Sequence, residues 1–453
     1  MNCQSQHDAK TRSFFRGRLV SPFEKIGWRL GKAVSSNFTT ICRVRGSLRE
    51  AALRAALDDS CIRFPLLRVR IENSPNGLWI DPGDVPPIPL RVVQAKVSEL
   101  ATIVATEIDD PILAETGPMF RCVLIRHEGE LQHLVLTFHH MMSDGMSSVT
   151  LMEYVLRRTA QYQSGQSPEN EEAHVTDTRP IDERLAVKQS GWRHFWKAVR
   201  FVVQTRRQDR RFGKVDTIRA DGEGTLADRR TRLIMREFDE EFVTQLVEKA
   251  RAEGTTVHGA ISAAVCLGIA NDHGDGESIS IRHRMPVNMR GRLDTTAKDE
   301  IGLMISMSIF RDRINSNDNF WQVAQNVRRQ IMAQIDKDIP TLFVRMMPRL
   351  YRMLGGDRLD DDQLADHWRQ QMPTTSGATN LGRVNLDVRS ELFDVESFQV
   401  AGCPGVIGDF ATYVATFRGR LYVNFYCPEP VFQQERAIAL ADDIVRRLRD
   451  ACA

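Results

Sequence analysis

The chain has 453 residues, a length that predicts two or three domains or one large double lobe. Hydrophobic residues make up 42% of the chain and charged residues 26%, which is ordinary for a soluble globular protein. The 61 basic and 59 acidic side chains leave a formal net charge of +2, so the charge balance gives no reason to expect nucleic acid as the main partner.

Eight cysteines are spread along the chain, and none of them forms a CxxC pair. This pattern gives no support for a zinc ribbon or a thioredoxin-type site, and it favours a reduced, intracellular protein. Residues 1–18 are polar and of mixed charge, whereas a signal peptide needs an apolar segment. The longest apolar run, near residues 260–270, is far shorter than the roughly 20 residues that span a bilayer. We therefore expect a cytoplasmic protein without a membrane-spanning segment.

Strands and helices alternate in the first part of the chain. Residues 37–45 are rich in β-formers and alternate, which predicts a strand. Ser47 and Glu50 then predict a capping box that starts a helix. Residues 120–126 and 131–138 predict two further strands, joined as a hairpin.

Residues 163–185 are polar, acidic and poor in aromatic side chains, which makes them the best candidate for a linker. Beyond the linker, the hydrophobic periodicity predicts helices near residues 239–250, 256–270, 320–335 and 437–448, and strands near 278–286, 302–311, 412–417 and 421–426. Because strands and helices alternate on both sides of the linker, we predict an α/β layered architecture.

Residues 139–145 (HHMMSDG) lie where a predicted strand ends and a helix begins. Neighbouring side chains of a strand point to opposite faces, so one histidine can pack inside while the other projects into a site. Histidine suits proton abstraction near neutral pH because its unperturbed pKa is about 6.5. Asp144 is placed to cap the helix or to pair with a distant arginine, and Gly145 allows close approach of a ligand.

Two other interpretations of this segment stay open on the residues alone. Adjacent histidines at a strand end are often polar edges of the core, and an aspartate before a helix is often only a cap. A metal site would need a third and a fourth ligand, and no His, Cys or carboxylate stands nearby at a helpful spacing. We therefore predict no metal.

The segment HHMMSDG resembles the HHxxxDG motif of the CoA-dependent acyltransferase superfamily. That superfamily includes nonribosomal peptide synthetase condensation domains, chloramphenicol and carnitine acyltransferases, plant BAHD enzymes, wax ester synthases and alcohol acetyltransferases. Residues 285–290 (MPVNMR) and 301–311 are similar to two consecutive segments of condensation domains. Residues 379–383 (TNLGR) resemble the SNLGR stretch of alcohol acetyltransferases and of mycobacterial phthiocerol dimycocerosyl transferases. The resemblance extends from about Arg16 to the last helix.

The resemblance implies an α/β fold of two similar, chloramphenicol-acetyltransferase-like lobes that form a V, with an active-site tunnel between them. Residues 1–180 would form the N-terminal lobe that carries the motif, and residues 181–453 the C-terminal lobe. The polar segment 163–185 fits the junction between such lobes. Donor and acceptor would enter the tunnel from opposite faces.

The resemblance also implies roles for single residues. The second histidine of the motif is the general base in this family, which assigns His140 to take the proton of the acceptor as it attacks the thioester carbonyl. No acyl-enzyme forms in the family, and the absence of a GxSxG elbow agrees with this. Asp144 would pair with Arg290 and order the loop, and His139 would support it structurally. Gly145 would bring backbone N–H groups towards the reacting carbonyl.

Thr379 and Asn380 lie where the family lines its substrate channel, and Asn380 would donate a hydrogen bond to the oxyanion or to the acyl carbonyl. An ordinary turn before Gly382 is the alternative for this pair. For Arg290, the alternative is a solvated surface position.

Departures from the family patterns narrow the subfamily. The chain has no DFGWG, for which residues 409–411 (DFA) are no substitute, and no NVPGP-like segment. It also lacks the opening motif of condensation domains and an attached carrier or adenylation domain. These departures leave a stand-alone, ester-forming enzyme as the leading hypothesis, with acyl-CoA as co-substrate and no bound cofactor.

Rival hypotheses stay open. The first is an amide-forming, condensation-type enzyme with a carrier-bound donor, and the second is a non-catalytic scaffold of the same fold. A metal-dependent hydrolase is the third. The expected partners are acyl-CoA or an acyl-carrier donor and a small alcohol or amine acceptor. We expect a monomer, because one chain supplies both lobes.

Residues 192–211 combine aromatic and basic side chains. Trp192, Trp196, Val199 and Val203 fall on one face of the predicted helix, with arginines and a lysine around it. One interpretation is weak contact with a membrane surface. The favoured interpretation is a crossover helix that packs its aromatic side chains on the body and exposes its charges.

Overall fold

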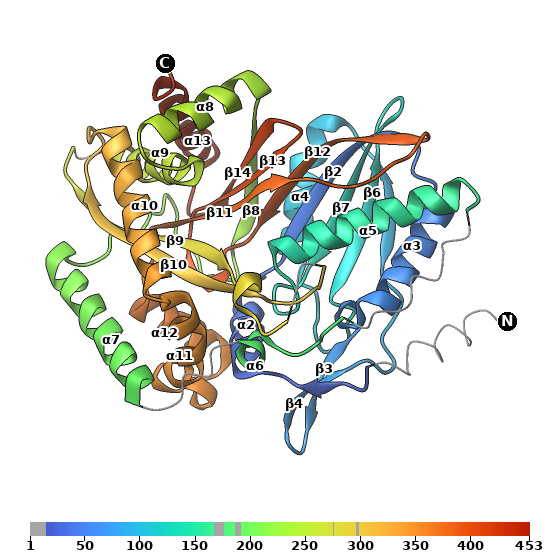
Figure 1. The fold of residues 1–453 in the computed structure, drawn as a ribbon, viewed down its shortest axis with the longest axis horizontal. Helices are drawn as coiled ribbons and strands as arrows, with labels where there is room; N and C mark the ends of the chain where they lie inside the picture. The colour runs from blue at the N-terminus through green and yellow to red at the C-terminus, as the bar shows by residue number, and fades with distance from the viewer. Residues whose placement is uncertain (1–14, 167–175, 186–191, 275, 296–298) are drawn as a thin grey trace.

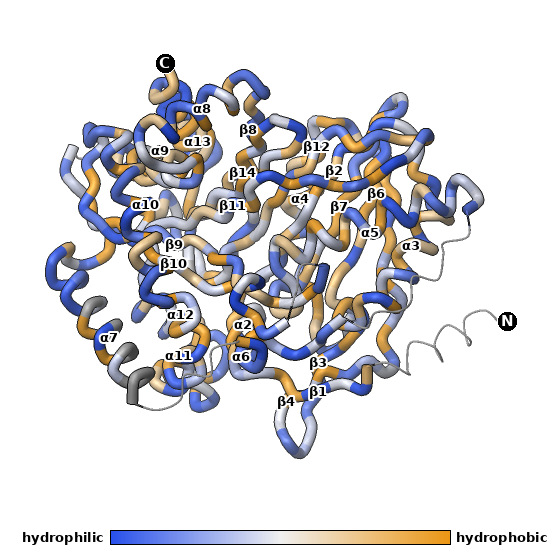
Figure 2. Tube along the Cα trace, viewed as in Figure 1, coloured by the Kyte–Doolittle hydropathy of each residue, from blue (hydrophilic) through white to orange (hydrophobic). Residues whose placement is uncertain are grey.

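The computed structural model describes residues 15–166, 176–185, 192–274, 276–295 and 299–453. These residues form two α/β lobes, each built on one sheet (Figure 1). The strand order is β12-β2-β7-β6-β5 in the first lobe and β10-β9-β11-β13-β14-β8 in the second. Hydrophobic residues are concentrated along the strands in the interior of both lobes (Figure 2).

The first lobe has an antiparallel sheet with one parallel edge, where β5 pairs with β6. Its strands are β2 (Phe38–Gly46), β5 (Leu90–Gln94), β6 (Phe120–Arg126), β7 (Leu131–Phe138) and β12 (Phe393–Gly402), and its helices are α3 (Glu50–Arg63), α4 (Leu100–Asp109) and α5 (Gly145–Gln163). Residues 133–138 of β7 are all buried, as expected for a strand that is covered on both faces. This buried strand leads directly into the HHMMSDG segment.

Strand β12 links the two lobes. It comes from the C-terminal part of the chain, yet it pairs antiparallel with β2 along its whole length. From the other sheet, the side chain of Asn424 donates a hydrogen bond of 3.0 Å to the carbonyl of Val400 in β12. The first lobe therefore contains a strand from beyond residue 180, and the division of the chain at that residue stays a prediction.

The second lobe is built around a helix that is buried on all sides. Its strands are β8 (Arg230–Phe238), β9 (Ile279–Asn288), β10 (Ile305–Ile314), β11 (Ser376–Val384), β13 (Ala411–Phe417) and β14 (Arg420–Glu429), and its helices are α8 (Glu240–Ala252), α9 (Val257–Asp272), α10 (Phe320–Asp336) and α13 (Gln434–Asp450). Every residue from 259 to 270 of α9 is buried. A helix that is apolar all round is stable only inside a core, and α9 packs against α10 and α13.

Smaller elements complete the fold. They are a three-stranded sheet of β1 (Arg18–Leu19), β3 (Arg70–Ser74) and β4 (Gly77–Asp81), and the helices α2 (Pro22–Ala33), α6 (Ile181–Arg184), α7 (Trp192–Phe212), α11 (Ile339–Met353) and α12 (Asp361–Gln371). Both α11 and α12 pack on α2, and α7 lies at the outer edge of the second lobe beside α11 (Figure 1).

The predicted capping box at Ser47 is wrong. Helix α3 begins at Glu50, and its N-cap is Arg49, which makes no side-chain capping bond. The backbone of Ser47 is instead held in place from two sides, because its N–H donates to Leu392 and its carbonyl accepts from Gln163. These tertiary contacts move the helix start beyond the capping signal.

The predicted linker is only partly described, because residues 167–175 lie outside the described ranges. Its last residues are not free of structure. Arg184 of α6 is fully buried and donates to Glu300 at 2.5 Å and to Thr295 at 2.6 Å. The end of this segment is therefore anchored to the second lobe.

The helix predicted over residues 192–211 is present as α7, but its apolar face is not packed as expected at two positions. Trp196 and Val203 are exposed by 47% and 41%, respectively. The side chain of Trp192 lies outside the described part of the structure. Contact of this helix with a membrane surface stays a prediction.

All seven cysteines in the described ranges are free thiols, and six of them are buried. Over the same ranges, no helix combines the length and the apolar character that a bilayer crossing requires.

Candidate active site

The two histidines of the motif have different environments. His139 is 6% exposed, and its Nδ1 accepts a hydrogen bond of 3.2 Å from the backbone N–H of Met141. Burial, together with the nearby His140 and against the opposing effect of Glu115, lowers the pKa of His139 to about 4. His140 is only half-buried. This is the division between an inside and an outside histidine that strand geometry predicts.

His140 has one defined tautomer in its neutral form. Its Nδ1 lies 2.9 Å from the carbonyl oxygen of Ser143. A carbonyl oxygen can only accept, so Nδ1 must carry the proton, and the lone pair of the neutral ring is then on Nε2. The ring of Phe38 lies 4.9 Å from the imidazole, centroid to centroid, and fixes its other side. The imidazole is thus oriented with a basic nitrogen available.

Asp144 is a buried acceptor for hydrogen bonds from both lobes. Its carboxylate accepts two bonds from Arg290, at 2.9 and 3.0 Å, in a bidentate ion pair. It also accepts the backbone N–H of Met304 at 2.9 Å, and both the N–H and the hydroxyl of Ser147 at 2.9 Å. Burial alone would raise the pKa of Asp144, but Arg290 and these hydrogen bonds hold the pKa below its ordinary value. The carboxylate is therefore ionised at neutral pH.

Ser147 extends the contact between the lobes. Its hydroxyl oxygen accepts the N–H of Gly302 at 3.1 Å, and the carbonyl oxygen of the same glycine, 2.9 Å away, competes with Asp144 for the single hydroxyl proton. Arg290 also donates to this hydroxyl, at 2.9 Å. The first turn of α5 is thereby fixed to the segment between β9 and β10, and with it the loop that carries His140.

Gly145 packs closely against Leu381 of β11, whose side chain would have to shift to admit a larger residue. A Cβ at this position would lie 2.4 Å from Cδ2 of Leu381. The contact brings the irregular part of β11, whose register shifts between Asn380 and Arg383, against the N-terminus of α5. The site therefore joins the end of β7, the start of α5 and the bulge of β11.

Thr379 and Asn380 are both half-buried on β11. The side-chain oxygen of Asn380 accepts the N–H of Gly382 at 2.8 Å, where the chain turns with a φ of +71°. The turn before Gly382, which was the alternative to a channel role for this pair, is thus present. It uses only the oxygen of Asn380, and within the described chain its NH₂ group has no hydrogen-bond partner.

Three functional contacts were not predicted from the sequence. Ser143 acts through its carbonyl, which any residue would supply, so no side-chain signal exists. Met304 likewise acts through its backbone N–H. Ser147 does carry a signal, since a hydroxyl three residues after a helix-capping aspartate is placed to share that carboxylate. In the described ranges, no group of three or more His, Cys, Asp or Glu side chains is arranged to hold a metal ion.

The fold and the family together give the class of this protein. The two-lobed α/β fold is shared with solved structures of an acetyltransferase and of a condensation domain. The model of the condensation domain family matches residues 30–342, more than half of the chain. The chain therefore belongs to the condensation domain family, and both the predicted superfamily and the predicted fold are confirmed.

Solved structures of low sequence identity share the fold over nearly the whole chain. The trichothecene 15-O-acetyltransferase TRI3 from Fusarium sporotrichioides is 10% identical, with a TM-score of 0.71 over 96% of this chain and 97% of that one. The polyketide synthase associated protein 5 from Mycobacterium tuberculosis is 14% identical, with a TM-score of 0.64 over 96% and 99%. The first condensation domain of the calcium-dependent antibiotic synthetase is 15% identical, with a TM-score of 0.67 over 97% of each chain. No curated protein sequence matches the chain.

Proposed function

We propose that this protein transfers an acyl group from acyl-CoA directly to a hydroxyl acceptor, with His140 as the general base. The observation that carries the proposal is the hydrogen bond from Nδ1 of His140 to the Ser143 carbonyl, which leaves Nε2 basic. Nε2 takes the proton of the acceptor hydroxyl as its oxygen attacks the thioester carbonyl carbon. The tetrahedral oxyanion then collapses, the C–S bond breaks, and the thiolate of CoA takes the proton back from His140.

Two groups are placed to stabilise the oxyanion. The first N–H groups of α5 have no partner within their own helix, and the positive end of the helix dipole lies there. The NH₂ group of Asn380 is the second candidate, since Leu381 beside it contacts the start of α5. The Asp144–Arg290 ion pair touches no reacting atom and acts as a positioning device for the loop and the helix.

A hydroxyl acceptor is favoured by residues 379–383 (TNLGR), which resemble the SNLGR stretch of alcohol acetyltransferases, and by the fold shared with an O-acetyltransferase. The test incubates the purified protein with acetyl-CoA and with longer acyl-CoAs, against a panel of alcohols and amines. Thiol release is followed, and the product is identified by mass spectrometry. We expect free CoA to form only with an acceptor, and the product to be an ester.

Other outcomes assign other functions. An amide product would contradict the hydroxyl acceptor and favour a condensation-type reaction. Thiol release from a carrier-bound donor, but from no acyl-CoA, would contradict the donor. No turnover with either donor and any acceptor would leave the fold with a binding role only.

A further inference from the structure

A cavity of about 400 Å³ lies in the second lobe, among α7, β9, β10, α10 and α11. Neither the motif residues 139–145 nor the β11 residues Thr379 and Asn380 line it. Its volume lies in the range of roughly 300–1,000 Å³ that is typical of small-molecule pockets. Part of the cavity lining is strongly cationic and part is apolar.

The cationic wall is made by neighbouring strands. Arg282 of β9 stands directly opposite Arg311 of β10 in the strand register, and Arg284 is two residues further along β9 on the same face. Like charges placed opposite each other on a sheet are destabilising. Of the charged residues that line the cavity, five are basic and only Asp209 is acidic. Asp209 contacts two of the three strand arginines, Arg282 at 2.9 Å and Arg311 at 3.2 Å.

Several N–H groups of these arginines are buried without a partner among the described residues. Arg284 and Arg311 are 6% and 2% exposed, yet Nε of Arg284 and both Nε and Nη1 of Arg311 have no hydrogen-bond partner within the described ranges. Burial, with the neighbouring Arg282, lowers the pKa of Arg284 to about 9. Leaving a buried donor unpaired is costly, and more so for a charged group. Asp209 alone does not balance the three strand arginines, so an anion in the cavity would offset their remaining charge.

The apolar part of the lining comes from β10 and α11. Met307 and Ile309 lie on the same face of β10 as Arg311, and Phe343 and Leu350 of α11 also line the cavity. A small inorganic anion would leave these apolar side chains uncovered. An aliphatic chain would cover them and gain affinity with each CH₂ group that it buries.

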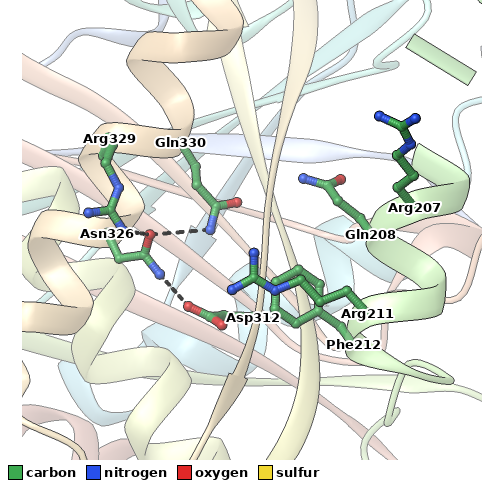
Figure 3. Close-up of a pocket in the computed structure, with 8 residues that line it drawn as sticks. All are labelled: Arg207, Gln208, Arg211, Phe212, Asp312, Asn326, Arg329 and Gln330. Carbon is green, nitrogen blue, oxygen red and sulfur yellow. Dashed lines mark hydrogen bonds between the residues drawn. The ribbon is translucent and has the colours of Figure 1, made fainter. Parts of the chain in front are cut away.

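A second cavity adjoins the first and shares Gln208 and Gln330 with it. Figure 3 shows Gln208 and Arg211 of α7 pointing towards the side where Asn326, Arg329 and Gln330 of α10 lie, with Asp312 between the two helices. This neighbouring space is also bordered mainly by basic and amide side chains. The basic half of α7 thus borders both cavities, although its arginines, Arg206, Arg207, Arg210 and Arg211, are themselves exposed.

We propose that the cavity between α7, β9, β10 and α11 binds an anionic amphiphile, with its carboxylate or phosphate head on Arg282, Arg284 and Arg311 and its aliphatic chain on α11. The site is separate from the proposed acyl-transfer centre, and ligand binding is measured without any acyl donor. Failure of one proposal therefore leaves the other unaffected.

The test is a displacement titration with dansylated undecanoic acid as the fluorescent probe and the full-length protein. Laurate, dodecyl phosphate and dodecanol compete for the site. We expect both anions to displace the probe at concentrations at least tenfold lower than dodecanol, since a charge-assisted hydrogen bond contributes roughly tenfold or more in affinity. A tighter laurate identifies fatty acids as the natural ligand class, and a tighter dodecyl phosphate identifies phosphorylated lipids.

Three variants make the test specific. Arg284→Met should weaken laurate at least tenfold and change dodecanol by less than about twofold. Asp209→Asn removes the competing carboxylate and should strengthen laurate several-fold, a gain that a merely structural role for Asp209 does not predict. Because the side chain of Asp209 is 43% exposed, this variant is expected to fold even if Arg284→Met does not. Arg389→Met, at a side chain that is 92% exposed, is the matched control and should change nothing.

Four results would overturn the proposal. The first is a wild-type protein that does not bind the probe, and the second is dodecanol that competes as well as laurate. The third is an Asp209→Asn protein with unchanged or weaker laurate binding. The fourth is CoA alone that competes as well as laurate, because CoA has no long aliphatic chain to cover the apolar side chains.

Discussion

The Asp144–Arg290 ion pair gives the sharpest prediction about stability. Replacing Arg290 with methionine keeps most of the side-chain volume but removes two of the five hydrogen bonds that the Asp144 carboxylate accepts. It also removes the guanidinium that compensates the cost of burying the Asp144 carboxylate. Breaking a buried pair in this way costs about 3–5 kcal/mol. We therefore expect Arg290→Met to lower the free energy of unfolding by about that amount at pH 7.

The assay is urea unfolding of three variants beside the wild type. Arg292→Met is the matched control, because Arg292 lies two residues away and pairs with Asp338, where the side chains are 30% and 26% exposed. Its loss should cost at most about 1 kcal/mol. The double variant Asp144→Asn/Arg290→Met carries no buried charge at the site. It should be more stable than Arg290→Met by about 1–3 kcal/mol.

The pH dependence has a definite sign. In the wild type the pKa of Asp144 is depressed in the folded state. Its contribution to the free energy of unfolding is therefore present above the unfolded pKa and is lost as the pH falls. In Arg290→Met the cost of burying the Asp144 carboxylate is less compensated, so the folded pKa of Asp144 rises. The loss of stability in this variant is therefore largest at neutral pH. The stability difference between the two proteins should therefore shrink on acidification. A cost for Arg290→Met no larger than for Arg292→Met, or one that does not change with pH, would refute this reasoning.

Three further predictions follow from the same contacts. Ser147→Ala removes the acceptor of the Gly302 N–H and a donor to Asp144, and it should cost about 1–3 kcal/mol in urea unfolding. A neutral result would contradict this contribution. In Gly145→Ala the new methyl group contacts Leu381, and the rate of acyl transfer should fall. Adding Leu381→Ala should restore the rate. A double variant as slow as Gly145→Ala would contradict the packing argument. The folded pKa of His139, about 4, lies below its unfolded value of about 6.5, so the free energy of unfolding falls as the pH is lowered from about 6.5 towards 4. Between pH 7.5 and 5.5 this loss of stability amounts to about 1.3 kcal/mol. His139→Asn should remove this pH dependence.

The sequence predicted the parts of the site that depend on local patterns. The strand ending at Phe138 contains an apolar run at residues 134–136, and the helix after it has an aspartate at its N-cap. Both signals lie within a few residues of the histidines. They were sufficient to predict an inside and an outside histidine at a strand-to-helix junction.

Other parts depended on contacts between distant segments. Asp144 and Arg290 are 146 residues apart in sequence, and only the family resemblance connected them. Strand β12 pairs with β2 across more than 300 residues, and its own sequence does not state which sheet it joins. The cationic cavity also escaped the sequence analysis. Arg282, Arg284 and Arg311 look like solvated strand residues until α7 and α11 cover them.

The misplaced start of α3 has the same physical origin. The capping signal at Ser47 is genuine, but the backbone of this residue is tied to Leu392 and Gln163, which lie far away in the sequence. Local propensity is worth about 1 kcal/mol at a helix cap, so two tertiary hydrogen bonds are enough to override it.

The central claim is that His140 is the general base, and the most direct measurement compares thiol release by the wild type, His140→Ala and His367→Ala. His367 is also half-buried, but it lies on α12 and outside the motif, so its loss controls for removing a histidine. The account predicts that His140→Ala remains folded and loses roughly 10²–10⁴-fold in acceptor-dependent rate, while His367→Ala stays close to the wild type. A His140→Ala protein that releases CoA as fast as the wild type would contradict it.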